Sequence, residues 1–181
     1  FSSSVLSAAA QAFGNLITHL IELGENAPKP AVRFIVNEQL SKEDVDALLQ
    51  KGDCSGLERL LLNRFGNPAT LLEKQRLEML GWLVQKGYLV VRVGIMRSGY
   101  GIVHAKYGLI YDPSGNAIVF SGSGNETAQG IIANYDHLEI SDSWTNPIRF
   151  QHYQEEFENV WNDIDAYVHT MPLPEAVEKE L

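Results

Sequence analysis

Residues 101–126 read GIVHAKYGLIYDPSGNAIVFSGSGNE, and this stretch decides the fold of the chain. Two apolar runs, at 107–111 and 117–120, flank the sequence DPSGN. Proline fixes one turn dihedral, and glycine and asparagine tolerate positive φ, so this composition predicts a β-hairpin. The hairpin is expected to bring residues 121–125 back beside the strand that carries His104.

Four polar side chains are expected to converge at the open end of this hairpin. Side chains two apart on a strand share a face, so His104 and Lys106 should point the same way. The Gly-Ser-Gly-Asn run adds Ser123 and Asn125 on a backbone that small residues leave open to a ligand. This set suits a phosphate, because lysine neutralises its charge, serine and asparagine donate hydrogen bonds, and histidine supplies a nucleophile or a proton carrier.

These residues also carry a resemblance to a known family. The sequences HAK at 104–106 and GSGN at 122–125 resemble the His-x-Lys and Gly-Ser-x-Asn (HKD) signature of the phospholipase D superfamily. The wider stretch HAKYGLIYDPSGNAIVFSGSGNET, with NYDHLEISDSW after it, is similar to the phospholipase D-like domains of prokaryotic proteins. In those proteins the domain is fused to superfamily 2 helicases (DEAD/DEAH or SNF2-type) or belongs to restriction-type proteins. The opening FSSS and closing MPLPEAVEKEL extend the resemblance over nearly the whole chain.

The resemblance implies an α/β fold with a phospholipase D-like mixed β-sheet flanked by helices on both faces. We therefore expect one domain over residues 1–170. In the resembled family a strand ends in a similar Phe-Ser-Ser stretch, so Phe1 could be the stub of a strand. The favoured interpretation is that Ser2, Ser3 and Ser4 cap the helix that follows. Residues 171–181 are expected to form a linker toward a downstream helicase. The length of 181 residues also suits a single domain.

The resemblance assigns catalytic roles to the polar cluster. His104 would attack phosphorus to give a phosphohistidine, while Lys106, Ser123 and Asn125 hold the phosphate. In the superfamily an acidic residue further along the chain hydrogen-bonds the catalytic histidine and orients it. Asp136 matches that position, with aspartate in place of glutamate.

Two further carboxylates remain open as supporting residues. Glu139 is the alternative to Asp136 for orienting the histidine. The superfamily also has an aspartate five positions after the lysine, where this chain has Tyr111. Asp112 follows one residue later, a shift that a β-bulge at the strand end can absorb.

The chain contains one HKD motif, yet the chemistry needs a second histidine to protonate the leaving oxygen. We therefore expect a homodimer in which the sites of two protomers abut. No Cys or His pair has zinc spacing, and no carboxylate quartet of a two-metal nuclease is present. No phosphate-binding loop of the Gly-x4-Gly-Lys type occurs either. No cofactor is thus expected for this chain, and ATP and magnesium would serve only the attached helicase.

The charge balance bears on the substrate. The net charge is −9, from 14 basic and 23 acidic residues, which argues against an autonomous high-affinity DNA-binding module. The charge distribution is compatible with a nuclease whose DNA is delivered by a neighbouring domain, because Lys86, Arg92 and Arg97 precede the HKD segment and are expected to lie together with it. The single cysteine, Cys54, rules out an internal disulfide framework and suits a cytoplasmic protein.

Apolar periodicity predicts the other elements. Helices are expected at 5–23, 41–50, 56–64, 68–87, 126–132 and 147–169, and strands at 31–37, 88–96 and 138–141. Trp144 is expected in the core near the site, whereas His152 and His169 are expected to be exposed and inert.

Three functions are consistent with these observations. The sequence favours a hydrolase, a metal-independent phosphodiesterase or nuclease acting on DNA within a larger helicase or restriction and defence protein. The alternative is a catalytically silent nucleic-acid-binding or dimerisation module. A phospholipase is less favoured, because no apolar or amphipathic membrane-contact segment is evident and no membrane partner is expected.

Overall fold

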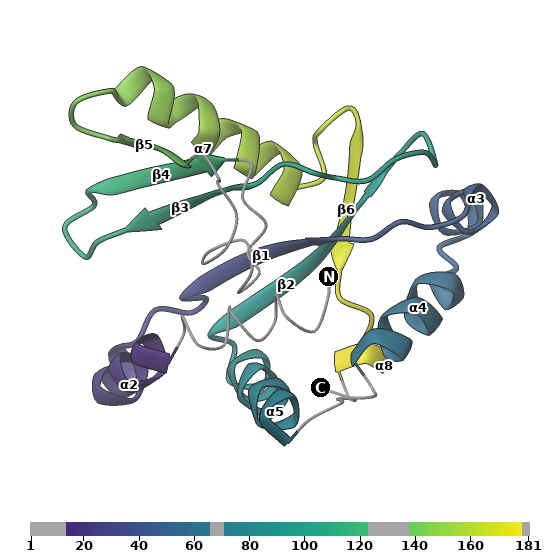
Figure 1. The fold of residues 1–181 in the computed structure, drawn as a ribbon, viewed down its shortest axis with the longest axis horizontal. Coiled ribbons are helices and arrows are strands. Elements are labelled where there is room, and N and C mark those ends of the chain that lie inside the picture. The colour runs from purple at the N-terminus through teal and green to yellow at the C-terminus, as the bar shows by residue number, and fades with distance from the viewer. Residues whose placement is uncertain (1–13, 66–70, 123–137, 179–181) are drawn as a thin grey trace.

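The structure, a computed structural model, describes residues 14–65, 71–122 and 138–178 (Figure 1). Its strands form two three-stranded sheets. Sheet A has the order β1 (Val32–Asn37), β2 (Leu89–Met96) and β6 (Val168–Pro172), with β1 parallel and β6 antiparallel to β2. Sheet B is the antiparallel meander of β3 (Tyr107–Tyr111), β4 (Ala117–Gly122) and β5 (Leu138–Asp142). The predicted α/β class with a mixed sheet is confirmed, but the described strands form two sheets instead of one.

Helices cover one face of sheet A (Figure 1). They are α2 (Gly14–Leu23), which runs into a 3-10 turn at Gly24–Asn26, α3 (Lys42–Lys51), α4 (Ser55–Phe65), α5 (Leu71–Gln85) and α8 (Glu175–Glu178). One buried cluster joins Val93 and Ile95 of β2 to α3, α4 and α8. A second joins Leu89 of the same strand to α2 and α5. Alternate residues of β2 thus form one continuous apolar face.

Local sequence signals explain several helix ends. The Ser41 hydroxyl accepts a hydrogen bond from the Asp44 N–H and caps α3, while Gly52 ends this helix with φ of 67°. In α7 (Pro147–Trp161), the Asn146 side chain accepts from the Arg149 N–H, and proline occupies the first turn. The helix starts predicted near residues 41 and 147 are confirmed.

Helix α7 packs against sheet B and also reaches the second face of sheet A. Phe150 is buried with Ala117 and Val119 of β4. At the other end of the helix, the Trp161 ring lies under the guanidinium of Arg92, 4.7 Å from its centroid. The Arg33 guanidinium lies 5.3 Å from the same ring and pairs with Glu158, at 2.5 Å for the closest atoms. Contacts between aromatic rings and arginines therefore join α7 to sheet A.

The C-terminal part of the chain differs from the prediction. Helix α7 ends at Trp161, because Asp163 adopts φ of 60° and a new strand, β6, follows. Leu173 and Val177 are buried in the core shared with α3 and α4, so residues 171–178 pack as part of this domain. Trp144 is 61% exposed, and its predicted place in the core is wrong.

Candidate active site

The chain that leads from β2 to β3 turns sharply at residues 97–101. Gly99 and Gly101 have φ of 75° and 84°, which other residues rarely adopt. The chain then returns across sheet A, where Val103 lies over Gly94: a Cβ built on that glycine would sit 3.6 Å from Val103 Cγ2. The segment that carries His104 therefore lies against β2 at Gly94.

His104 and Lys106 lie on this segment, just before β3. The prediction that both lie within a strand is therefore wrong. His104 is exposed, and Lys106 is half-buried. The hairpin ladder nevertheless reaches Lys106, because the Gly122 N–H donates to its carbonyl oxygen at 3.1 Å. The start of the GSGN run therefore lies beside the His-x-Lys segment. Ser123, Asn125 and Asp136 lie outside the described residues, as does the helix predicted at 126–132.

The pairing register shows which face of sheet B each residue occupies. Tyr107 pairs with Ser121, and both face α7: the Tyr107 and Tyr153 rings lie 5.4 Å apart, and the Tyr153 hydroxyl is 3.1 Å from Ser121 Oγ. Burial, with smaller contributions from nearby carboxylates, raises the pKa of the Tyr107 phenol and keeps it neutral. Strand alternation then assigns Lys106 to the opposite face, where Ile110 is exposed.

Glu139, the alternative orienting acid, belongs to the α7 face. It pairs with Ser121 across the strands, and its carboxylate forms an ion pair with Arg149 of α7. This places it on the other side of the sheet from Lys106.

Asp112 organises the hairpin turn. Its carboxylate accepts hydrogen bonds from the Asn116 side chain at 2.8 Å and from the Ser114 and Asn116 N–H groups at 2.8 and 2.9 Å. These bonds, that of the Asn116 side chain foremost, lower the pKa of Asp112. The β3–β4 register runs without a bulge from Tyr107 to Tyr111, so Asp112 lies at the end of β3 remote from Lys106. The idea that a bulge returns Asp112 to the site is wrong.

The arginines of the predicted basic patch have structural partners. Arg92 donates to the Trp161 carbonyl at 2.5 Å. Arg97 pairs with Asp163 at 2.6 Å and also donates to the carbonyls of Asp163 and Asp165. His169 Nδ1 lies 3.1 Å from the Asp163 carboxylate and is half-buried, so its predicted exposure is wrong. Sequence spacing gave no signal for this cluster, because it depends on the turn after α7.

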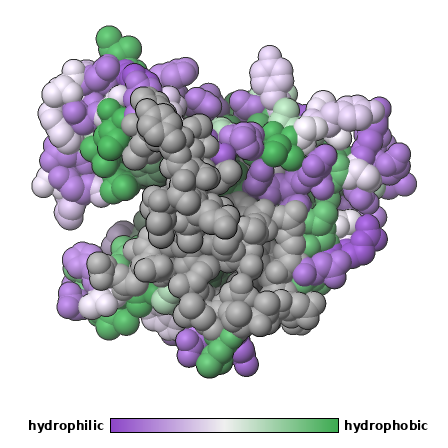
Figure 2. All heavy atoms as spheres, in the orientation of Figure 1, coloured by the Kyte–Doolittle hydropathy of each residue, from purple (hydrophilic) through white to green (hydrophobic). Residues whose placement is uncertain are grey.

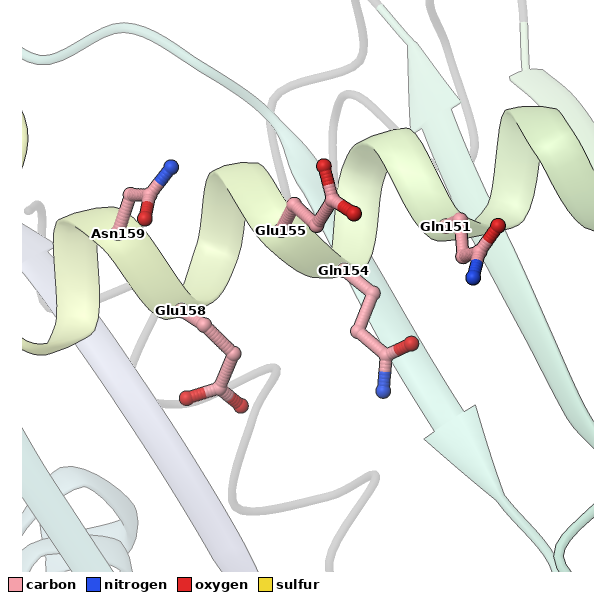
Figure 3. A pocket seen from close by; sticks show the side chains of 5 residues that line it. All are labelled: Gln151, Gln154, Glu155, Glu158 and Asn159. Atoms are coloured by element: carbon pink, nitrogen blue, oxygen red, sulfur yellow. The ribbon is translucent and has the colours of Figure 1, made fainter.

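A hollow lined by side chains of α7 is a poor phosphate site. The described side chains around it are polar: Gln151, Gln154, Glu155, Glu158 and Asn159 (Figure 3). Two of them are carboxylates, which repel an anion, and Glu158 is already paired with Arg33. Within the described ranges, no group of three or more His, Cys, Asp or Glu side chains is placed to hold a metal ion.

Comparison with protein-family models, curated proteins and solved structures finds no match for this chain. Within the described part of the chain, none of the helices has the length and apolar character needed to span a bilayer.

Proposed function

We propose that this chain is a metal-independent phosphodiesterase domain that cleaves DNA, with a phospholipase D-like fold. The observation that supports this most is the hydrogen bond from the Gly122 N–H to the Lys106 carbonyl. It brings the beginning of the GSGN run beside an exposed histidine and a lysine. An imidazole, an ammonium and hydrogen-bond donors near one another can hold and attack a phosphodiester.

The proposed reaction has two displacements at phosphorus. A His104 ring nitrogen attacks phosphorus and forms a P–N bond, while the bond to the leaving oxygen breaks. His104 of the partner subunit gives its proton to that oxygen. The imidazole of the partner subunit's His104 then takes a proton from water. The water oxygen attacks phosphorus, the P–N bond breaks, and the first His104 is released.

The supporting groups have separate roles in this proposal. Lys106 balances the phosphate charge, and Ser123 and Asn125 donate to its oxygens. Because Glu139 pairs with Arg149 on the far side of the sheet, Asp136 is the preferred acid to orient His104. Attachment to a helicase, and a cytoplasmic place in restriction or defence, follow from the resemblance alone.

A nuclease assay in EDTA tests the proposal. Wild-type protein should cleave labelled DNA without metal, whereas His104→Ala should lose the activity. His152→Ala is the matched control, since this histidine is also exposed but lies on α7. Cleavage that requires added magnesium, or that survives in His104→Ala, would refute the proposed chemistry.

The alternatives give different results in parallel measurements. DNA binding without cleavage would indicate a silent binding module. Release of head groups from phosphatidylcholine vesicles, with no DNA cleavage, would indicate a phospholipase. A size measurement that finds an active monomer would refute the shared dimeric site.

A further inference from the structure

The turn between β2 and β3 presents a large aromatic side chain to solvent. Tyr100 is 68% exposed. The flanking Gly99 and Gly101 hold positive φ angles, and Ser98 Oγ both accepts from the Tyr100 N–H at 3.3 Å and donates to the Tyr100 carbonyl at 3.2 Å. The backbone of the turn is therefore fixed while the ring projects outward.

A cation accompanies this ring. Lys42 Nζ, from the first turn of α3, lies 5.6 Å from the Tyr100 ring centroid, within the range of a cation–π contact. The turn packs on the same lysine, because a Cβ built on Gly99 would sit 3.3 Å from Lys42 Cγ. The surface over α3, at the right of Figure 2, is mainly hydrophilic. An exposed aromatic ring and an ammonium group thus lie together on a polar surface.

Tyr100 lies on the same segment as His104, the candidate nucleophile. Ile102 and His104 are exposed, while Val103 between them is half-buried over Gly94. Tyr100 and His104 are four steps apart along the chain, which span at most about 14 Å. That reach covers roughly four steps of a stacked nucleic-acid strand, at about 3.4 Å each.

We propose that Tyr100 is a stacking platform for an unpaired base of single-stranded DNA, with Lys42 beside it for the phosphate backbone. Proteins that bind single strands combine aromatic rings, which stack on any base, with basic groups that follow the backbone. A base paired in a duplex has neighbours on both faces and cannot lie on the ring. The inference rests on the proposed nuclease function, since it supplies the substrate class that this site would take.

Fluorescence anisotropy with a labelled oligothymidylate of about 20 nucleotides tests this on the whole chain. Tyr100→Ala should weaken binding by roughly 5- to 150-fold, the loss expected for one stacked base. Tyr100→Phe keeps the ring and should bind within about twofold of wild type. Lys42→Ala should weaken binding. It should also make the negative slope of log affinity against log salt concentration shallower by about one. Trp144→Ala is the control, because this aromatic side chain is also exposed but follows β5 of sheet B, so its loss should leave binding unchanged.

Two arms separate the failure of this inference from the failure of the nuclease proposal. Hydrolysis of bis(4-nitrophenyl) phosphate by wild type and His104→Ala tests the chemistry with a substrate too small to reach Tyr100. If hydrolysis depends on His104 but oligothymidylate binding is absent, or is the same in Tyr100→Ala, the stacking site is wrong and the nuclease stands. If binding depends on the Tyr100 ring but no hydrolysis occurs, the stacking site stands and the nuclease is wrong. Equal losses on a single strand and on its duplex would also overturn the proposed preference for unpaired bases.

Discussion

Trp161 offers a direct test of how α7 is fixed to sheet A. The residue is 8% exposed and stacks on Phe157, with ring centroids 5.8 Å apart and an interplanar angle of 17°. Arg33 and Arg92 approach the same ring from neighbouring strands of sheet A. Trp161→Ala removes the surface on which both guanidinium groups rest.

The expected cost follows from burial. Truncation of a buried aromatic side chain to alanine costs about 3–5 kcal/mol, including the cavity that it leaves. The two cation–π contacts, at about 0.5–1 kcal/mol each for exposed to half-buried groups, place this site near the middle of that range. We therefore expect a loss of about 4 kcal/mol, which corresponds to a fall in Tm of about 8–16 °C for a domain of this size.

Urea unfolding followed by circular dichroism measures this loss without relying on tryptophan emission. Trp144→Ala is the matched control, because the same side chain is removed from an exposed position and should change stability by less than about 0.5 kcal/mol. Trp161→Phe should lose less than Trp161→Ala, since a ring remains for the arginines. A cost below about 1 kcal/mol for Trp161→Ala, or an equal cost for Trp144→Ala, would refute this account of the joint.

Three further predictions concern the C-terminal segment, the α7–β4 contact and the hairpin turn. Val177→Ala should destabilise the domain by about 2 kcal/mol, because Val177 is fully buried; unchanged urea unfolding would mean that α8 is not part of the core. Tyr153→Phe should cost about 1 kcal/mol through loss of the hydrogen bond to Ser121, and an unchanged Tm would show that this bond contributes nothing. The pKa of Asp112 is lowered from 3.8 by the Asn116 hydrogen bonds, so its contribution to stability is present above 3.8 and is lost as the pH falls through the lowered pKa. A carboxyl NMR titration should find that lower pKa, and Asn116→Ala should raise it.

Local signals predicted much of the fold. The Ser41 cap, the DPSGN turn and the β-branched run of β2 each depend on residues close in sequence, and each lies where expected. The approach of Gly122 to Lys106 also follows from the hairpin, because an antiparallel register extends from the turn toward its open end.

Other features depend on contacts that sequence spacing does not reveal. The apolar positions after Trp161 continue a helical period, but Asp163 adopts a left-handed conformation and interacts with Arg97 and His169. The following residues then pair with β2, far away in the chain. Trp144 is exposed because the turn after β5 directs it outward, a choice that hydrophobicity alone does not predict. Tyr100 gave no sequence signal, since its importance lies in its exposure and its contact with Lys42.

The pairing of β6 with β2 has a consequence for the order of assembly during synthesis. The strands of sheet B lie close together in the sequence, so this sheet can form from one short stretch of nascent chain. Strand β2 ends at Met96, and its partner β6 is synthesised about 70 residues later. At typical translation rates that delay lasts roughly 4–14 s, during which one edge of β2 has no β6 to cover it. Because such an edge can pair with another chain, slow elongation should favour ribosome-associated aggregation of this protein.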